Sequence, residues 1–203
     1  MRRSLLLIAR LLTLPCMVWY TLRGRRERTF RSIMQAAALL PGVSGSYIRL
    51  ALLNWLAEGT GSDCSVAVGT LFSHSHVKLG NSVYVGAFCN IGWARISDDA
   101  LIGSGVHIIS GKNSHFHHRV DIPIARQGGV RTPVHIGPAA WIGSGAIIMA
   151  DVGEQCVIGA GAVVTRAVPP WSIAVGSPAR TIGDRRASTS MTPAEPLQPE
   201  ILE

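Results

Sequence analysis

A six-residue repeat runs through the middle of the chain and restricts its fold more than any other feature. Aliphatic residues followed by glycine or a small polar residue recur every six positions, with two shorter steps, Ile91 to Ile96 and Ile148 to Val152. The repeated positions are Leu79, Val85, Ile91, Ile96, Ile102, Ile108 and, after a gap, Ile136, Ile142, Ile148, Val152, Ile158 and Val164. A helix repeats every 3.6 residues and an ordinary strand every two, so neither explains the pattern. A sustained hexapeptide repeat is typical of a parallel β-helix, in which each short strand forms one face of a coil.

Composition agrees with such a solenoid and gives its limits. Hydrophobic residues make up 47% of the 203 residues but aromatic residues only 6%, so the core must be aliphatic. Nineteen of the 22 glycines lie between Gly59 and Gly183, where sharp corners between faces need their conformational freedom. We therefore assign residues 61–183 to a mainly β domain, a parallel β-helix that begins after a glycine-rich stop.

The repeat is interrupted over residues 111–133, GKNSHFHHRVDIPIARQGGVRTP. A loop of this length inside a regular domain is usually functional or disordered. Because it carries His115, His117 and His118, we interpret it as an extruded functional loop.

Residues 1–60 are expected to be helical and to associate with a membrane. Residues 5–22 are the most apolar stretch, but Arg10 lies within it and Pro15 interrupts it, which disfavours a membrane-spanning helix. We prefer a helix that lies in the membrane interface. A spanning helix and a helix that caps the protein's own β-helix are the alternatives.

The net charge of +7 belongs entirely to this N-terminal part. Residues 1–58 contain nine arginines and two glutamates, whereas residues 59–203 contain ten residues of each sign. Basic residues interleaved with apolar ones favour a membrane surface over nucleic acid. We expect peripheral contact with the cytoplasmic face of a membrane through residues 1–58, and a solvated basic face without a partner is the alternative.

Three smaller expectations complete the organisation of the chain. Residues 30–57 should form two helices, the first ending at Pro41-Gly42 and the second starting after Ser44-Gly45-Ser46. Residues 184–203 lack periodicity and are expected to be a disordered tail. The four cysteines show no CxxC spacing, which argues for a reducing compartment and against a disulfide framework or a cysteine zinc site.

The repeat and its ending, GAGAVVTRAVPPWSIAVGSPARTI, resemble the hexapeptide-repeat acyltransferases, in particular the acetyl-coenzyme A O-acetyltransferases. The resemblance covers residues 64–183. It implies a left-handed β-helix, acetyl-CoA as co-substrate without a metal, and a homotrimer whose active sites lie between two subunits. The implied acceptor is a hydroxyl of a saccharide, polysaccharide precursor or lipid-linked molecule.

The resemblance also implies roles for individual residues. His115, in Ser110-Gly111-Lys112-Asn113-Ser114-His115, matches the base that removes the proton of the acceptor hydroxyl, a task suited to a neutral imidazole. His117 and His118 are close enough in sequence to compete for that role. The matching coenzyme contacts are Ser144, Ala160, Thr165, Arg166 and Arg180, and the candidate acceptor residues are Asn90, His107 and Trp141.

The spacing of Asn90 and His107 indicates, independently of the resemblance, that these two candidate acceptor residues lie together. Each precedes an axis residue and they are 17 positions apart, so both should point outward from the same face, one coil apart. His74 and His76 are expected to lie in an early coil or turn without chemistry. A metal-dependent protein resembling the γ-class carbonic anhydrases and a non-catalytic scaffold are the rival functions, while no GxGxxG, Walker loop or HExxH supports nucleotide or zincin chemistry.

Overall fold

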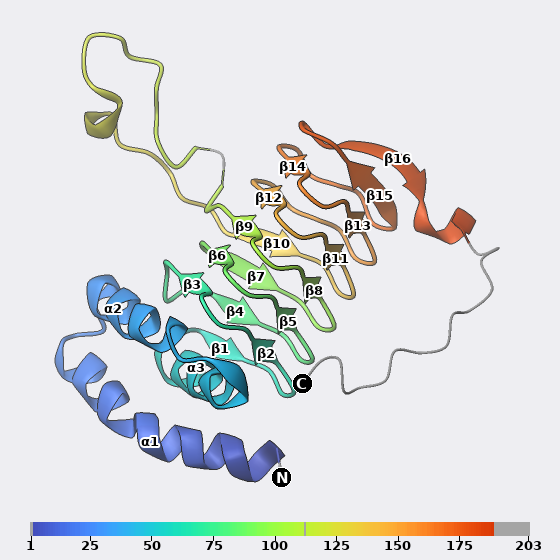
Figure 1. Cartoon of the computed structure of the whole chain (residues 1–203). Helices are drawn as coiled ribbons and strands as arrows, with labels where there is room; N and C mark the ends of the chain where they lie inside the picture. The colour runs from blue at the N-terminus through green and yellow to red at the C-terminus, as the bar shows by residue number, and fades with distance from the viewer. Residues whose placement is uncertain (1, 112, 189–203) are drawn as a thin grey trace.

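The computed structural model describes residues 2–111 and 113–188, which form a helical region followed by a β-solenoid (Figure 1). The helices are α1 (Arg2–Leu22), α2 (Glu27–Ala38) and α3 (Gly42–Leu56). Two short 3-10 helices are η1 (Ile124–Arg126) and η2 (Arg185–Ser188).

The solenoid has three long faces, each formed by a sheet whose neighbouring strands are parallel. Sheet A contains β1 (Gly59–Thr60), β4 (Lys78–Leu79), β7 (Ala94–Ile96) and β10 (Val134–Ile136). Sheet B contains β2 (Ser65–Val66), β5 (Tyr84–Val85), β8 (Leu101–Ile102), β11 (Trp141–Ile142), β13 (Val157–Ile158), β15 (Ser172–Val175) and β16 (Arg180–Asp184). Sheet C contains β3 (Leu71–Phe72), β6 (Asn90–Ile91), β9 (His107–Ile108), β12 (Ile147–Ile148) and β14 (Val163–Val164). Only the last pair, β15 and β16, is antiparallel among these strands.

The chain passes from sheet A to sheet B to sheet C and back, which confirms the parallel β-helix that the repeat predicts. All twelve predicted axis residues are 2% exposed or less. They fill the interior with aliphatic side chains, as the low aromatic content requires. The arrangement is consistent with the left-handed coil that the family resemblance implies.

The departures from the six-residue step all fall at one corner of the solenoid, between sheets C and A. Axis residues remain six positions apart wherever the chain passes from A to B or from B to C. The short steps, Ile91 to Ile96 and Ile148 to Val152, both join sheet C to sheet A, and so does the interruption at 111–133. Two corners are therefore regular, and the third, the C–A corner, is where the chain varies.

Helices α2 and α3 close the open end of the first coil. Helix α2 contacts β3, and α3 contacts β1 and β2. Their buried side chains, which include Phe30, Met34, Leu53 and Leu56, join the aliphatic core of the solenoid. These two helices thus cap the β-helix, whereas α1 packs on α3 and α2 in a second layer (Figure 1).

The helix boundaries correct two expectations. Helix α1 continues through Pro15, and α3 begins at Gly42, so the predicted break at Ser44-Gly45-Ser46 lies inside it. A Cβ atom at Gly45 would lie 2.1 Å from the Leu40 carbonyl oxygen. Glycine is therefore needed at position 45 because the α2–α3 turn passes over the first turn of α3, not because the helix stops.

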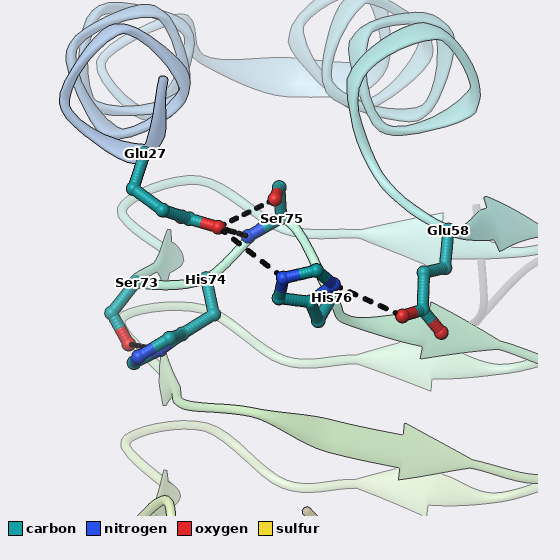
Figure 2. Close-up of polar contacts among 6 residues, drawn as sticks. All are labelled: Glu27, Glu58, Ser73, His74, Ser75 and His76. Carbon is teal, nitrogen blue, oxygen red and sulfur yellow. Dashed lines mark hydrogen bonds and ion pairs between the residues drawn. The ribbon is translucent and has the colours of Figure 1, made fainter. Parts of the chain in front are cut away.

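The serine–histidine segment, predicted to be a turn without chemistry, joins the helices to the first coil (Figure 2). The Ser75 amide and hydroxyl donate to the Glu27 carboxylate at 3.1 and 2.6 Å. His76 lies between two carboxylates, with Nδ1 3.1 Å from Glu58 Oε1 and Nε2 3.9 Å from Glu27 Oε1. These contacts connect the start of α2 to the segment between sheets C and A.

The C-terminal boundary also differs from the sequence expectation. The predicted tail starts at 184, but Asp184 ends β16 and η2 follows directly. Arg186 forms an ion pair with Asp184 at 2.6 Å, and this pairing lowers the pKa of the Asp184 carboxyl to about 2. The rest of the predicted tail, 189–203, lies outside the described residues.

Candidate active site

The interruption in the repeat forms a loop that leaves β9, extends away from the coils and returns to β10 (Figure 1). Its outgoing and returning segments are held together near the solenoid by backbone hydrogen bonds. The Val130 amide donates to the Asn113 carbonyl at 2.9 Å, and the Phe116 amide donates to the Gly128 carbonyl at 3.0 Å. The loop therefore has a closed neck, and the C–A corner projects it from the body of the protein.

His115 lies between these two neck bonds, and its side chain is exposed. A Cβ atom at Gly129 would lie 2.0 Å from the Ser114 carbonyl oxygen and 2.9 Å from the His115 Cα. Only glycine permits this approach, so Gly129 determines how close the His115 backbone lies to the returning strand. His117 and His118, the competing candidates, are also exposed and lie farther from the neck.

A cavity of about 550 Å³ lies at the base of the loop. Its lining comes from the neck and from the two C–A corners that follow it: Gly111, Asn113, Val130, Thr132, Pro133, Val134, His135, Met149, Ala150, Asp151, Thr165, Arg166 and Ala167. Thr165 and Arg166, two predicted coenzyme contacts, thus share a cavity with the neck that carries the predicted base. Thr132 and Asp151 were not anticipated, because the repeat carries no signal for residues brought together by an interruption.

The other predicted coenzyme contacts lie at a different corner. Ser144 and Ala160 are exposed in consecutive B–C turns, and the Gly161 amide donates to the Ser144 carbonyl at 2.9 Å. Arg180 follows the segment that crosses the last coil, where the Ala179 amide donates to the Val163 carbonyl at 2.8 Å. The five predicted coenzyme residues therefore flank sheet C, with Thr165 and Arg166 on one side and the other three on the opposite side.

Asn90 and His107 occupy the outer face of sheet C. They are register partners in the β6–β9 pair and both are exposed, which confirms the stacking predicted from their spacing. Trp141 is 51% exposed but belongs to β11 in sheet B. Within one chain, the three predicted acceptor residues therefore lie on two faces, and Trp141 is separated from the other two.

Phe88 borders the face that carries Asn90, and the sequence analysis missed it. The corresponding left-handed position of the other B–C turns is occupied by Gly69, Gly105, Gly145 and Gly161. Phe88 adopts the same conformation, with φ 57°, although a bulky residue there costs about 1–2 kcal/mol, and its side chain is 69% exposed. Its ring covers Gly69, where a Cβ atom would lie 2.3 Å from Phe88 Cδ1. The missing glycine in the repeat was the signal that could have found it.

Burial raises the pKa of the Cys89 and Cys156 thiols, so neither has the character of a nucleophile. Within residues 2–111 and 113–188, no group of three or more His, Cys, Asp and Glu side chains could hold a metal ion.

A family model and a similar protein both relate this chain to bacterial transferases with hexapeptide repeats. The family model "Bacterial transferase hexapeptide (six repeats)" matches residues 133–166. A putative acetyltransferase of Staphylococcus aureus is 32% identical over 161 residues, 76% of this chain and 77% of the relative. The chain belongs to the hexapeptide-repeat acetyltransferases.

Two further members of the comparison define how far this relationship extends. A probable acetyltransferase of Mycobacterium tuberculosis is 32% identical over 152 residues, but the chain spans only 48% of that relative's length. A galactoside acetyltransferase, solved in complex with coenzyme A, has the same fold, with a TM-score of 0.63, 24% identity and coverage of 81% of this chain and 82% of that one.

The hexapeptide family match covers some of the predicted site residues and not others. The matched range, 133–166, contains Ser144, Ala160, Thr165 and Arg166. His115, Asn90 and His107 precede it. Arg180 follows the range and Trp141, a candidate acceptor residue, lies inside it, so the matched range does not separate the predicted coenzyme residues from the predicted acceptor residues.

Proposed function

We propose that the protein is an acyltransferase that moves an acetyl group from acetyl-CoA to a hydroxyl of a saccharide, polysaccharide precursor or lipid-linked acceptor. One observation carries the proposal: in a member of this family, the loop neck beside His115 and the cation Arg166 border the same cavity. Acyl transfer from a phosphate-bearing coenzyme to a hydroxyl requires a base that accepts the hydroxyl proton and a residue that binds the phosphates.

The residues present suit acetyl-CoA, which supplies the activated acyl group. Arg166 at the cavity and Arg180 beyond sheet C offer guanidinium groups to phosphates, and Thr165 adds a hydroxyl. The cavity also has apolar walls, including Met149 and Val130, against which an uncharged chain can lie.

In the proposed reaction, His115 accepts the proton of the acceptor hydroxyl as the hydroxyl oxygen bonds to the thioester carbonyl carbon. Backbone N–H groups of the B–C corner, such as that of Ala160, would stabilise the negative charge that develops on the carbonyl oxygen. The carbon–sulfur bond then breaks. The protonated His115 returns its proton to the departing thiolate, which restores the neutral imidazole and leaves an ester and a thiol.

The face beside Phe88 supports a saccharide as acceptor. An exposed aromatic ring next to Asn90, with His107 one coil away, combines an apolar surface with polar groups that donate and accept hydrogen bonds. Such a combination suits a sugar, whose ring has apolar faces and hydroxyl edges.

The extruded loop supports a homotrimer with shared sites. Val120 is fully exposed, Ile124 is 55% exposed and Val130 is 50% exposed, and apolar side chains on a projecting loop favour burial against another surface. In the proposed trimer, the loop of each subunit covers sheet C of its neighbour and brings His115 to the neighbour's Phe88 and Asn90. Both faces of the site would then be complete only in the assembly.

The central experiment is the activity of His115→Ala with acetyl-CoA and a panel of saccharide acceptors. Loss of the base should lower acetyl transfer by roughly 10²–10⁴, while coenzyme binding stays within about twofold, because the imidazole acts on the acceptor. His117→Ala is the matched control and should retain activity. Full activity in His115→Ala together with loss in His117→Ala would move the base to His117, and full activity in both would remove the proposed mechanism.

A mixing experiment tests the shared site separately. Trimers assembled from equal amounts of His115→Ala and Asn90→Ala chains should recover up to about a quarter of wild-type activity, because one in four sites would pair two intact halves. Recovery of nothing, with trimers formed normally, would place both residues in the same subunit's site. A mass of one chain for the active species would contradict the trimer itself.

A further inference from the structure

Helix α1 has two faces with different surroundings. Its inner face buries Ala9, Thr13 and Tyr20. Helices α2 and α3 close the first coil, and α1 adds only Tyr20 to the buried core, with Leu6 and Cys16 packed against it. The opposite face of α1 therefore requires another explanation.

That opposite face is apolar along its whole length. Leu7, Leu11 and Leu22 are 60%, 64% and 82% exposed. The full set of exposed apolar side chains on α1 is Leu5, Leu7, Ile8, Leu11, Leu12, Leu14, Val18, Trp19 and Leu22. This set is wider than the narrow stripe with which one helix packs against another. By length and composition, Ser4–Leu22 is the one helical stretch in the described residues that is long and apolar enough to cross a membrane.

The polar side chains within this stretch include two threonines, which are bonded within the helix, and one half-buried arginine. Arg10 is half-buried, and its enclosed Nε atom has no hydrogen-bond partner in the described part of the chain. The Thr13 hydroxyl donates to the Ala9 carbonyl at 2.9 Å and the Thr21 hydroxyl to the Met17 carbonyl at 2.9 Å. The threonine hydroxyls therefore need no solvent, and a helix that lies in the interface leaves the half-buried Arg10 within reach of the headgroups.

Positive charge follows directly at the C-terminal end of α1. The side chains of Arg23, Arg25, Arg26 and Arg28 are all exposed. The acid among them, Glu27, is bonded to Ser75 of the first coil (Figure 2). The Arg23 guanidinium lies 5.7 Å from the Trp19 ring, so an amphipathic aromatic residue stands where the apolar face meets the basic segment.

We propose that α1 lies flat in the surface of an anionic lipid membrane, with its Leu7–Leu22 face among the acyl chains and the arginines of residues 23–28 at the headgroups. A second copy of the chain is the less favoured occupant, because parallel pairing of this face would bring two groups of four arginines together, whereas anionic headgroups would neutralise them. A spanning α1 would have to give up its contacts with α3. The proposal does not depend on acetyl transfer.

The position of α1 also orients the enzyme. Helix α1 lies across the end of the solenoid, beyond α2 and α3, so the coils extend away from the proposed membrane (Figure 1). A helix is about 10 Å wide and successive coils are about 4.8 Å apart, so two helical layers and three coils put the extruded loop roughly 35 Å from the surface. On the cytoplasmic face, an acceptor of some length would reach it more readily than a lipid headgroup.

Flotation of the full-length protein with vesicles tests the proposal. Vesicles of phosphatidylcholine containing about 30% phosphatidylglycerol should carry the protein to the top of a gradient, and pure phosphatidylcholine vesicles should bind at least tenfold more weakly. Replacing Leu11 by serine should weaken partitioning roughly tenfold. Replacing Arg26 by glutamine should weaken it roughly fivefold at low salt.

The matched controls are Leu39→Ser and Lys78→Gln, which change an exposed leucine and an exposed cation outside α1. Both should bind vesicles like the wild type, and all variants should keep the wild-type melting temperature. Three outcomes would overturn the proposal: no flotation at low salt, equal effects of the control and α1 variants, or a lower solution mass for Leu11→Ser, which would show that another copy covers the face. Binding that resists alkaline carbonate would replace the interfacial helix by a spanning one.

Discussion

The helical region and the solenoid reach stability in different ways. Every coil of the solenoid repeats the same contact, an aliphatic residue stacked on its equivalent in the next coil, as Ile102 stacks below Ile142 and Ile142 below Ile158. The helical cap relies on contacts that occur once. Chief among these is Arg49, which is fully buried and donates to the carbonyls of Val66, Ala37 and Leu40 at 3.0, 3.0 and 2.7 Å.

This difference has a consequence for how each region responds to change. A repeated contact can be lost once with little effect, because the neighbouring coils supply the same packing on both sides. A buried cation bonded to three carbonyls has no substitute, and desolvation already lowers the pKa of Arg49. The cap should therefore be sensitive to single substitutions where the solenoid is tolerant.

The largest expected effect is that of Arg49→Leu. It leaves three carbonyl oxygens without their donor at about 1 kcal/mol each, so the free energy of unfolding should fall by about 3 kcal/mol. The comparison variant is Ile142→Val in the solenoid, which should cost about 1 kcal/mol. Chemical denaturation followed by circular dichroism measures both.

Limited proteolysis would sharpen this comparison. In Arg49→Leu, cleavage should appear first within residues 1–58, while the coils remain resistant. Equal losses of stability in the two variants, or cleavage that begins in the coils, would mean that the two regions do not differ in the way described.

A smaller effect is expected at the irregular B–C turn. Phe88→Gly restores the residue type of the other turns and relieves the left-handed strain, so the free energy of unfolding should change by less than about 1 kcal/mol. If the ring contacts the acceptor, the KM for the acceptor should rise about fivefold, with the KM for acetyl-CoA unchanged. Leu71→Ala, at an exposed position of the same face, is the control. An unchanged acceptor KM would make Phe88 irrelevant to binding.

The smallest effect concerns pH and the junction between the two regions. Burial lowers the pKa of His74, whose Nδ1 lies 3.1 Å from Ser73 Oγ (Figure 2). The unfolded chain therefore takes up this proton more readily, and stability should fall as the pH drops below about 6.5. His74→Asn should reduce the loss of melting temperature between pH 7 and pH 5 by a few degrees.

The exposed His117 gives the control for this prediction. The pH dependence of His117→Asn should equal that of the wild type. If the melting temperatures of His74→Asn and the wild type fall by the same amount between pH 7 and pH 5, proton uptake by His74 does not couple to folding.

Much of the solenoid could be predicted because its rules are local. The six-residue step identified twelve axis residues, and the 17-residue spacing placed Asn90 and His107 in register. The six-residue step missed the buried axis positions of the first and last coils, Val66, Phe72, Val168 and Ala174. The position of α3 was harder to predict, since Gly45 serves a contact with Leu40 that no local pattern encodes. The early histidines lie in a turn, as predicted, but their contacts with the helices could not be predicted for the same reason: Glu27 lies 48 positions from Ser75, its hydrogen-bond partner.

By itself, the sequence determined the β-helix, its interior and the place where a loop must leave it, because a repeat is read from neighbouring residues and each coil obeys the same sterics. Only the tertiary structure decided that the irregular steps share one corner, that Thr165 and Arg166 meet the loop neck there, and that Trp141 lies on another face. It alone separated α1 from the capping helices. These are relations between distant segments. They are set by the packing of whole coils and helix layers, which no local periodicity contains.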